Sequence, residues 1–149
     1  MPPTTVQPLL ADLDAVLARL ADEPLATRES LGQFAIVVFL VGDRNDDGDR
    51  LVEAITIGLG LSEDDVERLM PHGRIGLESL HVAPPADTAR DLAFLLICAV
   101  AATSRPPTRT QVQVLAHLGA GLGIEEPAVA DILSAELGLP LATPAPVSP

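Results

Sequence analysis

The uninterrupted apolar run at residues 34–41 is the feature that most constrains how this chain can fold. Its sequence is Phe-Ala-Ile-Val-Val-Phe-Leu-Val, and Gly42 and an acidic stretch at residues 43–50 follow it directly. A run without polar side chains must be buried on nearly all sides, whereas a stretch rich in carboxylates must face water or a cation. The chain therefore places its densest negative charge at the end of its most buried element.

The composition favours a core made of helices. Hydrophobic residues make up 48% of the 149 residues, but aromatic residues make up only 2%, with neither Trp nor Tyr. The core must then be filled by Ala, Leu, Val and Ile, which suits close helix-helix packing better than a sandwich or a barrel. We therefore expect an all-α fold in one compact domain.

Apolar residues recur at helical spacing along the chain, and prolines and glycines separate the segments. This pattern predicts a bundle of about six to seven helices over residues 8–138. A flexible leader (1–7) and a disordered, proline-rich tail (139–149) are expected on either side. Residues 74–82 are ambiguous. The residues expected to cap helices at their N-termini are Thr27, Ser62, Asp87 or Thr88, and Thr108.

The two halves of the chain align when Gly60-Leu61-Ser62 is set beside Gly123-Ile124-Glu125. Each half then gives a buried helix, a break, an amphipathic helix, a glycine turn and a short helix with an acidic start. The alignment predicts a degenerate tandem helix-loop-helix repeat. In the second half, residues 103–108 replace the acidic stretch with Thr-Ser-Arg-Pro-Pro-Thr, so only the first half is expected to hold a cation.

The net charge of −12 limits the possible partners. Such a surface repels phosphate backbones, and the aromatic platforms that stack single-stranded bases are missing, so nucleic-acid binding is not expected. Cations or a basic protein partner are the natural counterparts. The single cysteine, Cys98, is expected to be a buried hydrophobic residue. No apolar run approaches the ~20 residues of a membrane span, and we expect a soluble, cytoplasmic protein of unknown oligomeric state.

The acidic stretch matches part of a calcium-binding EF-hand loop. Loop positions 1, 3, 5, 6 and 7 are occupied by Asp43, Asn45, Asp47, Gly48 and Asp49. Position 12 is Ala54 instead of the bidentate acid, and Glu53 lies one residue early. Two interpretations follow. The stretch is either a solvated loop before a helix at Leu51, or a weak Ca²⁺ or Mg²⁺ site with a dissociation constant on the order of 10⁻⁴ to 10⁻³ M. The predicted ligands are Asp43, Asn45, Asp47, Asp49 and Glu53.

No catalytic set emerges, and we expect no enzyme. The three histidines lack ligand-like spacing, and no Ser, His and acid combination indicates a nucleophile. The stretch around Glu78-Ser79-Leu80 resembles the Asp-Ser-Leu signature of acyl carrier proteins, whose serine carries phosphopantetheine, although Pro84-Pro85 interrupts the helix that should follow. The alternative function is therefore a carrier, or a small-molecule-binding domain that uses Ser79 or a cleft between the apolar helices.

Together, the repeat and its Asp47-Gly48 loop resemble the TerB-like family of tellurite-resistance and stress-response proteins. That family is an all-helical bundle in which a buried helix, an acidic Asp-Gly loop and a helix bearing Glu occur twice. The resemblance covers roughly residues 28–138 and implies a metal-binding acidic patch at Asp47, Gly48 and Glu53. It predicts a non-enzymatic protein that acts through protein partners in the stress response.

Overall fold

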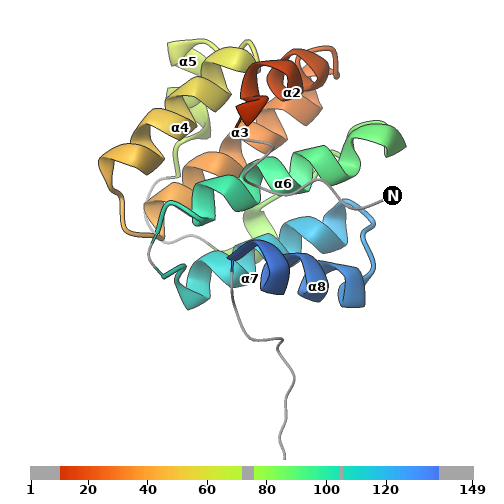
Figure 1. Cartoon of the computed structure of the whole chain (residues 1–149). Helices are drawn as coiled ribbons and strands as arrows, with labels where there is room; N and C mark the ends of the chain where they lie inside the picture. The colour runs from red at the N-terminus through yellow and green to blue at the C-terminus, as the bar shows by residue number, and fades with distance from the viewer. Residues whose placement is uncertain (1–10, 72–75, 105, 138–149) are drawn as a thin grey trace, which may run out of the picture.

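A computed structural model describes residues 11–71, 76–104 and 106–137 (Figure 1). The predicted leader and tail lie outside these ranges. In the described part of the chain the structure is all-helical, without strands, which confirms the predicted fold class. The α-helices are α2 (Leu13–Leu20), α3 (Leu25–Leu40), α4 (Asp46–Gly58), α5 (Glu63–Leu69), α6 (Arg90–Ala101), α7 (Arg109–Gly121) and α8 (Glu126–Leu137).

Two short 3₁₀ turns lie in the segment between α5 and α6. They are η1 (Leu77–Ser79) and η2 (Asp87–Ala89). The backbone at residues 80–86 is neither helix nor strand, which answers the ambiguity of residues 76–82, while residues 74 and 75 lie outside the described ranges. Within those ranges, no helix combines the length and the apolar character needed to cross a bilayer.

Helices α3 and α6 form the centre of the bundle (Figure 1). Residues 34–38 of α3 and residues 93–101 of α6 are all buried. A helix that is apolar all round can be stable only when other elements cover it on every side. The cover comes from α4 and α5 against α3 and from α7 and α8 against α6, and α3 and α6 also pack on each other.

The tandem repeat is confirmed by contacts that recur in both copies. Near the start of α3, Arg28 Nη1 donates a hydrogen bond to the carbonyl of Leu59 at 3.1 Å. At the start of α6, Arg90 Nη1 donates to the carbonyl of Leu122, also at 3.1 Å. The residue after each of these leucines is a glycine with positive φ, Gly60 at 75° and Gly123 at 81°. Each arginine therefore fixes the end of the helix that follows its own.

The two copies are joined by a reciprocal pair of hydrogen bonds at equivalent positions. Asn45 Nδ2 donates to the carbonyl of Thr103 at 2.7 Å, just beyond α6. Thr108 Oγ1 donates to the carbonyl of Val41 at 3.0 Å, just beyond α3. Carbonyl groups at a helix end have no partner within the helix and must find one elsewhere when they are buried. Each copy thus satisfies the end of the other copy's central helix.

Two of the predicted helix caps are confirmed, both as capping boxes. Ser62 pairs with Asp65 at the start of α5, and Thr108 pairs with Gln111 at the start of α7. In each box the cap side chain accepts from the third helical amide, and the third side chain accepts from the amide of the cap.

The other two predicted caps are wrong. Helix α3 begins at Leu25, directly after Pro24, whose fixed φ suits a helix start. Thr27 therefore lies inside the helix, where it is buried and its hydroxyl donates to the carbonyl of Pro84 at 3.5 Å. Helix α6 begins after η2 without a side-chain cap, because Asp87 and Thr88 are part of that turn.

Gln111 is the most heavily used buried polar side chain at the junction of the copies. It is fully buried, and its Nε2 donates to the carbonyl of Val38 at 2.9 Å and to Ser104 Oγ at 3.0 Å. Its Oε1 accepts from the amide of Thr108 at 2.9 Å. Replacing Gln111 by an apolar residue would leave several buried groups without a partner.

We predict that Gln111→Leu lowers the free energy of unfolding by about 2–4 kcal/mol, since each unsatisfied buried group costs roughly 1–3 kcal/mol. The exposed Gln113 on the same helix provides the matched control, and Gln113→Leu should change the stability by less than about 0.5 kcal/mol. Urea denaturation measures both variants. Equal stabilities for the two would contradict this role of Gln111.

Candidate functional site

The acidic stretch is largely the first turns of a helix. Helix α4 begins at Asp46, so the prediction of a loop up to Leu51 is wrong. Asn45 is the N-cap, and its Oδ1 accepts a hydrogen bond from the amide of Gly48 at 2.8 Å. Asp46, Asp47 and Asp49 fill the first turn, where the partial positive charge of the helix N-terminus stabilises carboxylates. Much of the local negative charge is thus explained by helix initiation.

The five residues predicted as metal ligands do not fit a cation site in this arrangement. Both polar atoms of the Asn45 amide are used within the fold. In an α-helix, residues two positions apart point to different sides, so Asp47 diverges from Asp49, and only Asp49 and Glu53 share a face. Asp43 precedes the helix, and its amide donates to Ser104 Oγ at 3.0 Å. Within the described ranges, no group of three or more His, Cys, Asp or Glu residues is placed to hold a metal.

We predict that Asn45→Ala lowers the free energy of unfolding by about 1–2 kcal/mol, because it removes the α4 cap and the bond to Thr103. The loss should be the same in EDTA and in millimolar calcium. Ala54→Glu, which completes the EF-hand pattern in sequence, should produce no calcium binding in calorimetry, since residue 54 is already helical. A clear gain of calcium affinity in Ala54→Glu would show that the stretch can form a loop around an ion.

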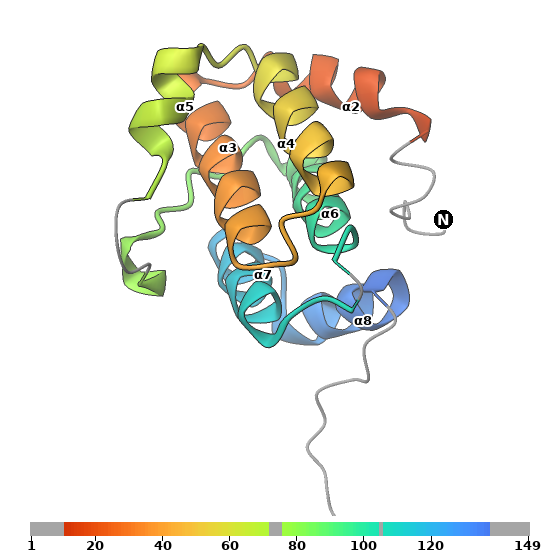
Figure 2. The same cartoon turned by 90° about the vertical axis from the view of Figure 1, so that its left-hand side faces the viewer.

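A groove of about 670 Å³ lies between α4 and α5, over α3. Figure 2 shows α3 between these two helices. The floor is apolar and comes from Ile36, Phe39 and Leu40 of α3. The α4 wall includes Ile57, and the α5 wall includes Val66. The groove is therefore built entirely from the first copy of the repeat.

In the second copy, α8 packs directly on α7. A Cβ on Gly119 of α7 would lie only 2.6 Å from a methyl carbon of Val129 of α8. Without that Cβ, Val129 can enter the space beside α7.

In the first copy, helices α4 and α5 are not among the closely packed pairs. The repeat alignment places Thr56 at the position of Gly119 and Val66 at that of Val129.

Larger side chains in the first copy keep the groove open. Counted from the equivalent arginines Arg28 and Arg90, the residues that correspond to Phe39 and Leu40 are Ala101, at the end of α6, and Ala102, directly after it. Phe39, Leu40 and Thr56 all line the groove. Side chains of this size occupy the space into which α5 would otherwise settle, because packed interiors leave no spare volume. The groove therefore follows from differences between the two copies at equivalent positions.

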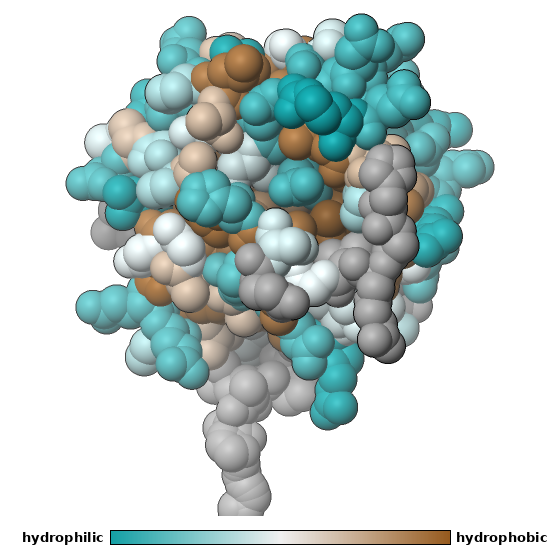
Figure 3. Space-filling model, turned by 180° about the vertical axis from the view of Figure 1, so that it is seen from behind, coloured by the Kyte–Doolittle hydropathy of each residue, from teal (hydrophilic) through white to brown (hydrophobic). Residues whose placement is uncertain are grey.

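Ile57 places an exposed apolar side chain on the groove. It is 66% exposed, more than the other large exposed hydrophobic residues described, Leu25 at 49% and Leu77 at 36%. Scattered exposed apolar residues are normal, and Figure 3 shows hydrophobic side chains between mostly hydrophilic ones on one face. Ile57 differs because it adjoins a concave apolar surface. Such a combination is typical of a binding site.

Four carboxylates line the groove, two on each wall. Asp49 and Glu53 belong to α4, and Glu63 and Glu67 belong to α5. All four residues are exposed. Within each pair the residues are four positions apart, so they are neighbours on one helix face, where like charges destabilise a helix by roughly 0.2–0.5 kcal/mol.

The second copy lacks most of these charges. Its equivalent residues are Val112, Ala116, Glu126 and Ala130, of which only Glu126 is acidic. The same fold thus forms without the charged rim, and we conclude that the rim is not required for folding.

Helix α5 is held in place by polar contacts with α3. Arg68 forms an ion pair with Glu29 of α3 and a second one with Asp65 at 2.9 Å. Gln33 Nε2 donates to the carbonyl of Leu69 at 3.3 Å. The pKa of Asp65 is lowered, first because the amide of Ser62 donates to its carboxylate and then because of Arg68. This contribution to stability is present above the ordinary pKa of Asp and is lost as the pH falls below it.

The cysteine, Ser79 and two of the three histidines lie in the described part of the chain. Cys98 is buried, and burial raises the pKa of its thiol, which keeps the thiol protonated and unreactive. Ser79 ends the turn η1, and its hydroxyl donates to the carbonyl of Gly76 at 2.6 Å. No helix follows Ser79 up to residue 86, unlike the carrier signature. His81 is exposed, and His117 Nε2 lies 2.9 Å from the carbonyl oxygen of Leu80, while His72 lies outside the described residues.

The position of the groove is not visible in the amino-acid sequence. Its lining comes from three helices, and the open space between α4 and α5 depends on contacts that do not form. One local signal was present. Ile57 lies off the apolar stripe of Leu51, Ile55 and Leu59 on α4, where a polar residue is expected.

Comparisons with known protein families, with curated proteins and with solved structures found no match. The resemblance to the TerB-like family stays a prediction that depends on the repeat and the short Asp47-Gly48 motif. The function is therefore inferred from the groove and its charges.

Proposed function

We propose that the protein is a non-enzymatic binding module that acts through a protein partner, with the groove between α4 and α5 as its docking surface. The observation that carries this proposal is the exposed Ile57 beside an apolar floor. Burying such a side chain in a partner releases about 25 cal/mol for each Å² of apolar surface removed from water. An open groove between helices also suits the recognition of a helical segment.

The resemblance to the TerB-like family adds a role in the stress response to this proposal. That role depends on the sequence motifs alone. A divalent cation is left out of the proposal, because Asn45 caps α4 and the other predicted ligands do not converge.

A small-molecule site is the second candidate. The groove volume of about 670 Å³ lies within the range of roughly 300–1,000 Å³ found for small-molecule pockets. Attachment of cargo through Ser79 receives no support from its position on a 3₁₀ turn. A small ligand in the groove would shield Ile57 from water without any peptide. Experiment can therefore distinguish a small-molecule site from a peptide-docking surface.

We predict that helix-forming peptides selected from a display library will bind the groove with micromolar affinity. Ile57→Ser should weaken their binding at least tenfold, because it removes the most exposed apolar contact. Leu25→Ser is the matched control, since Leu25 is exposed but does not line the groove, and it should leave binding unchanged. Fluorescence anisotropy measures both variants.

Neither substitution removes a buried side chain, so both variants should keep the parent stability within about 0.5 kcal/mol. If no library peptide binds, or if binding is equal in Ile57→Ser and the parent, the groove is not a peptide-docking surface.

A further inference from the structure

We propose that the partner segment that occupies the groove is a basic amphipathic helix, with an apolar stripe flanked on both sides by Lys or Arg. This inference rests on the proposed function and specifies the chemistry of the partner. It follows from the position of the charges on the groove walls and from the length of the walls.

The charges lie on both sides of the apolar floor. The α4 wall carries Asp49 and Glu53, and the α5 wall carries Glu63 and Glu67. Among the described residues, no arginine lines the groove, and these four carboxylate groups form no hydrogen bond or ion pair with one another or with the described arginines. A ligand that buries the floor therefore passes between two negative rows, and basic side chains on both of its flanks match them.

The negative charge also argues against other occupants. A second copy of this chain would bring another net charge of −12 toward the acidic rim, and like charges brought together oppose association. Nucleic acids and anionic membrane surfaces are repelled for the same reason. A basic segment of another protein gains from the attraction that these ligands lack.

The length of the groove sets the length of the partner segment. Helix α4 has 13 residues and is therefore about 20 Å long, and the part that lines the groove, from Asp49 to Ile57, covers about 12 Å of it. A ligand helix of about 14 residues spans that wall, and apolar residues at i, i+3, i+4 and i+7 form one continuous stripe along it. Lys or Arg residues beside the stripe then face the carboxylates of both walls.

The test uses three synthetic peptides of about 14 residues, a length set by the α4 wall. The first is a Leu/Lys peptide with leucines at the stripe positions, the second keeps the stripe but replaces Lys by Glu, and the third is a scrambled Leu/Lys peptide. We expect only the first to bind the parent protein with micromolar affinity. Its affinity should fall strongly as the ionic strength rises from about 0.01 M to 1 M, where the Debye length shortens from about 30 Å to about 3 Å.

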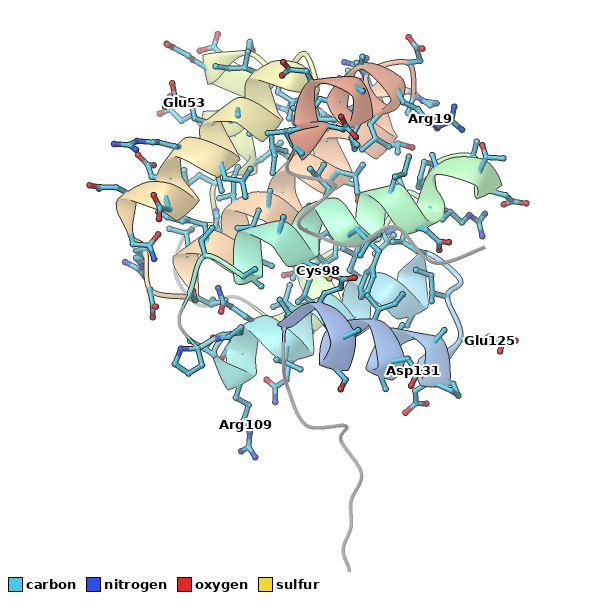
Figure 4. The ribbon with its side chains drawn as sticks, viewed as in Figure 1. Arg19, Glu53, Cys98, Arg109, Glu125 and Asp131 are labelled. Carbon is cyan, nitrogen blue, oxygen red and sulfur yellow. The ribbon has the colours of Figure 1, made fainter. Side chains whose placement is uncertain are left out.

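The double variant Glu53→Gln/Glu67→Gln removes one charge from each wall and should weaken binding of the Leu/Lys peptide about tenfold. The matched control Glu125→Gln/Asp131→Asn removes the same charge from the α8 side of the molecule, far from Glu53 in Figure 4, and should change binding less than twofold. Ile57→Ser should also weaken binding at least tenfold, and Leu25→Ser should not.

Each alternative outcome is distinct. Equal losses in the two double variants, or equal binding of the scrambled peptide, would mean general attraction to an acidic protein and would overturn the inference. If the Leu/Glu peptide binds as tightly as the Leu/Lys peptide, the partner need not be basic. The groove would then still be a docking surface. If the parent protein self-associates and Ile57→Ser abolishes that association, the occupant of the groove is a second copy of this chain. If neither these peptides nor library peptides bind, the proposed function fails as well.

Discussion

The burial of the two central helices is the constraint on which the rest of the structure depends. Because residues 34–38 of α3 and residues 93–101 of α6 are apolar and all buried, the two helices must pack on each other and be covered by the flanking helices. The carbonyls of Val41 and Thr103, just beyond the ends of these helices, are half-buried and need donors. Asn45 and Thr108 supply these donors across the junction, and Gln111 reaches the carbonyl of Val38. The helix caps of one copy thus complete the end of the other copy's central helix.

The duplication leaves this core intact while the outer helices differ. In the second copy a glycine on α7 allows α8 to close against it, whereas in the first copy bulkier residues hold α4 and α5 apart. Of the groove residues on α3, Phe39 and Leu40 lie at the edge of the core. Ile57 is exposed and lies outside the core, so Ile57→Ser should leave the fold undisturbed while it tests the proposed binding.

Much of the fold could be predicted because its signals are local. The run at residues 34–41, the glycine turns and the capping boxes at Ser62 and Thr108 are each visible within a few residues. The start of α4 could not be predicted, because Asn45 followed by several acids fits both a helix cap and an ion-binding loop. The choice depends on the distant carbonyl of Thr103. The groove likewise depends on residues that are far apart in the sequence. Thr56 lines it in the first copy, whereas Gly119, at the same position of the second copy, leaves room for Val129 of α8.

The hydrogen bonds of Arg28 and Arg90 also bear on the order in which the molecule folds. Arg28 is 31 residues from Leu59, and Arg90 is 32 residues from Leu122, so each hydrogen bond closes a loop within one copy. The bonds between the copies join residues 58 and 67 apart, and longer loops lose more chain entropy on closure. We expect each half to organise early and the junction to form late. Loss of Gln111 should then accelerate unfolding and leave the folding rate nearly unchanged, and a slower folding rate instead would place the junction in the transition state.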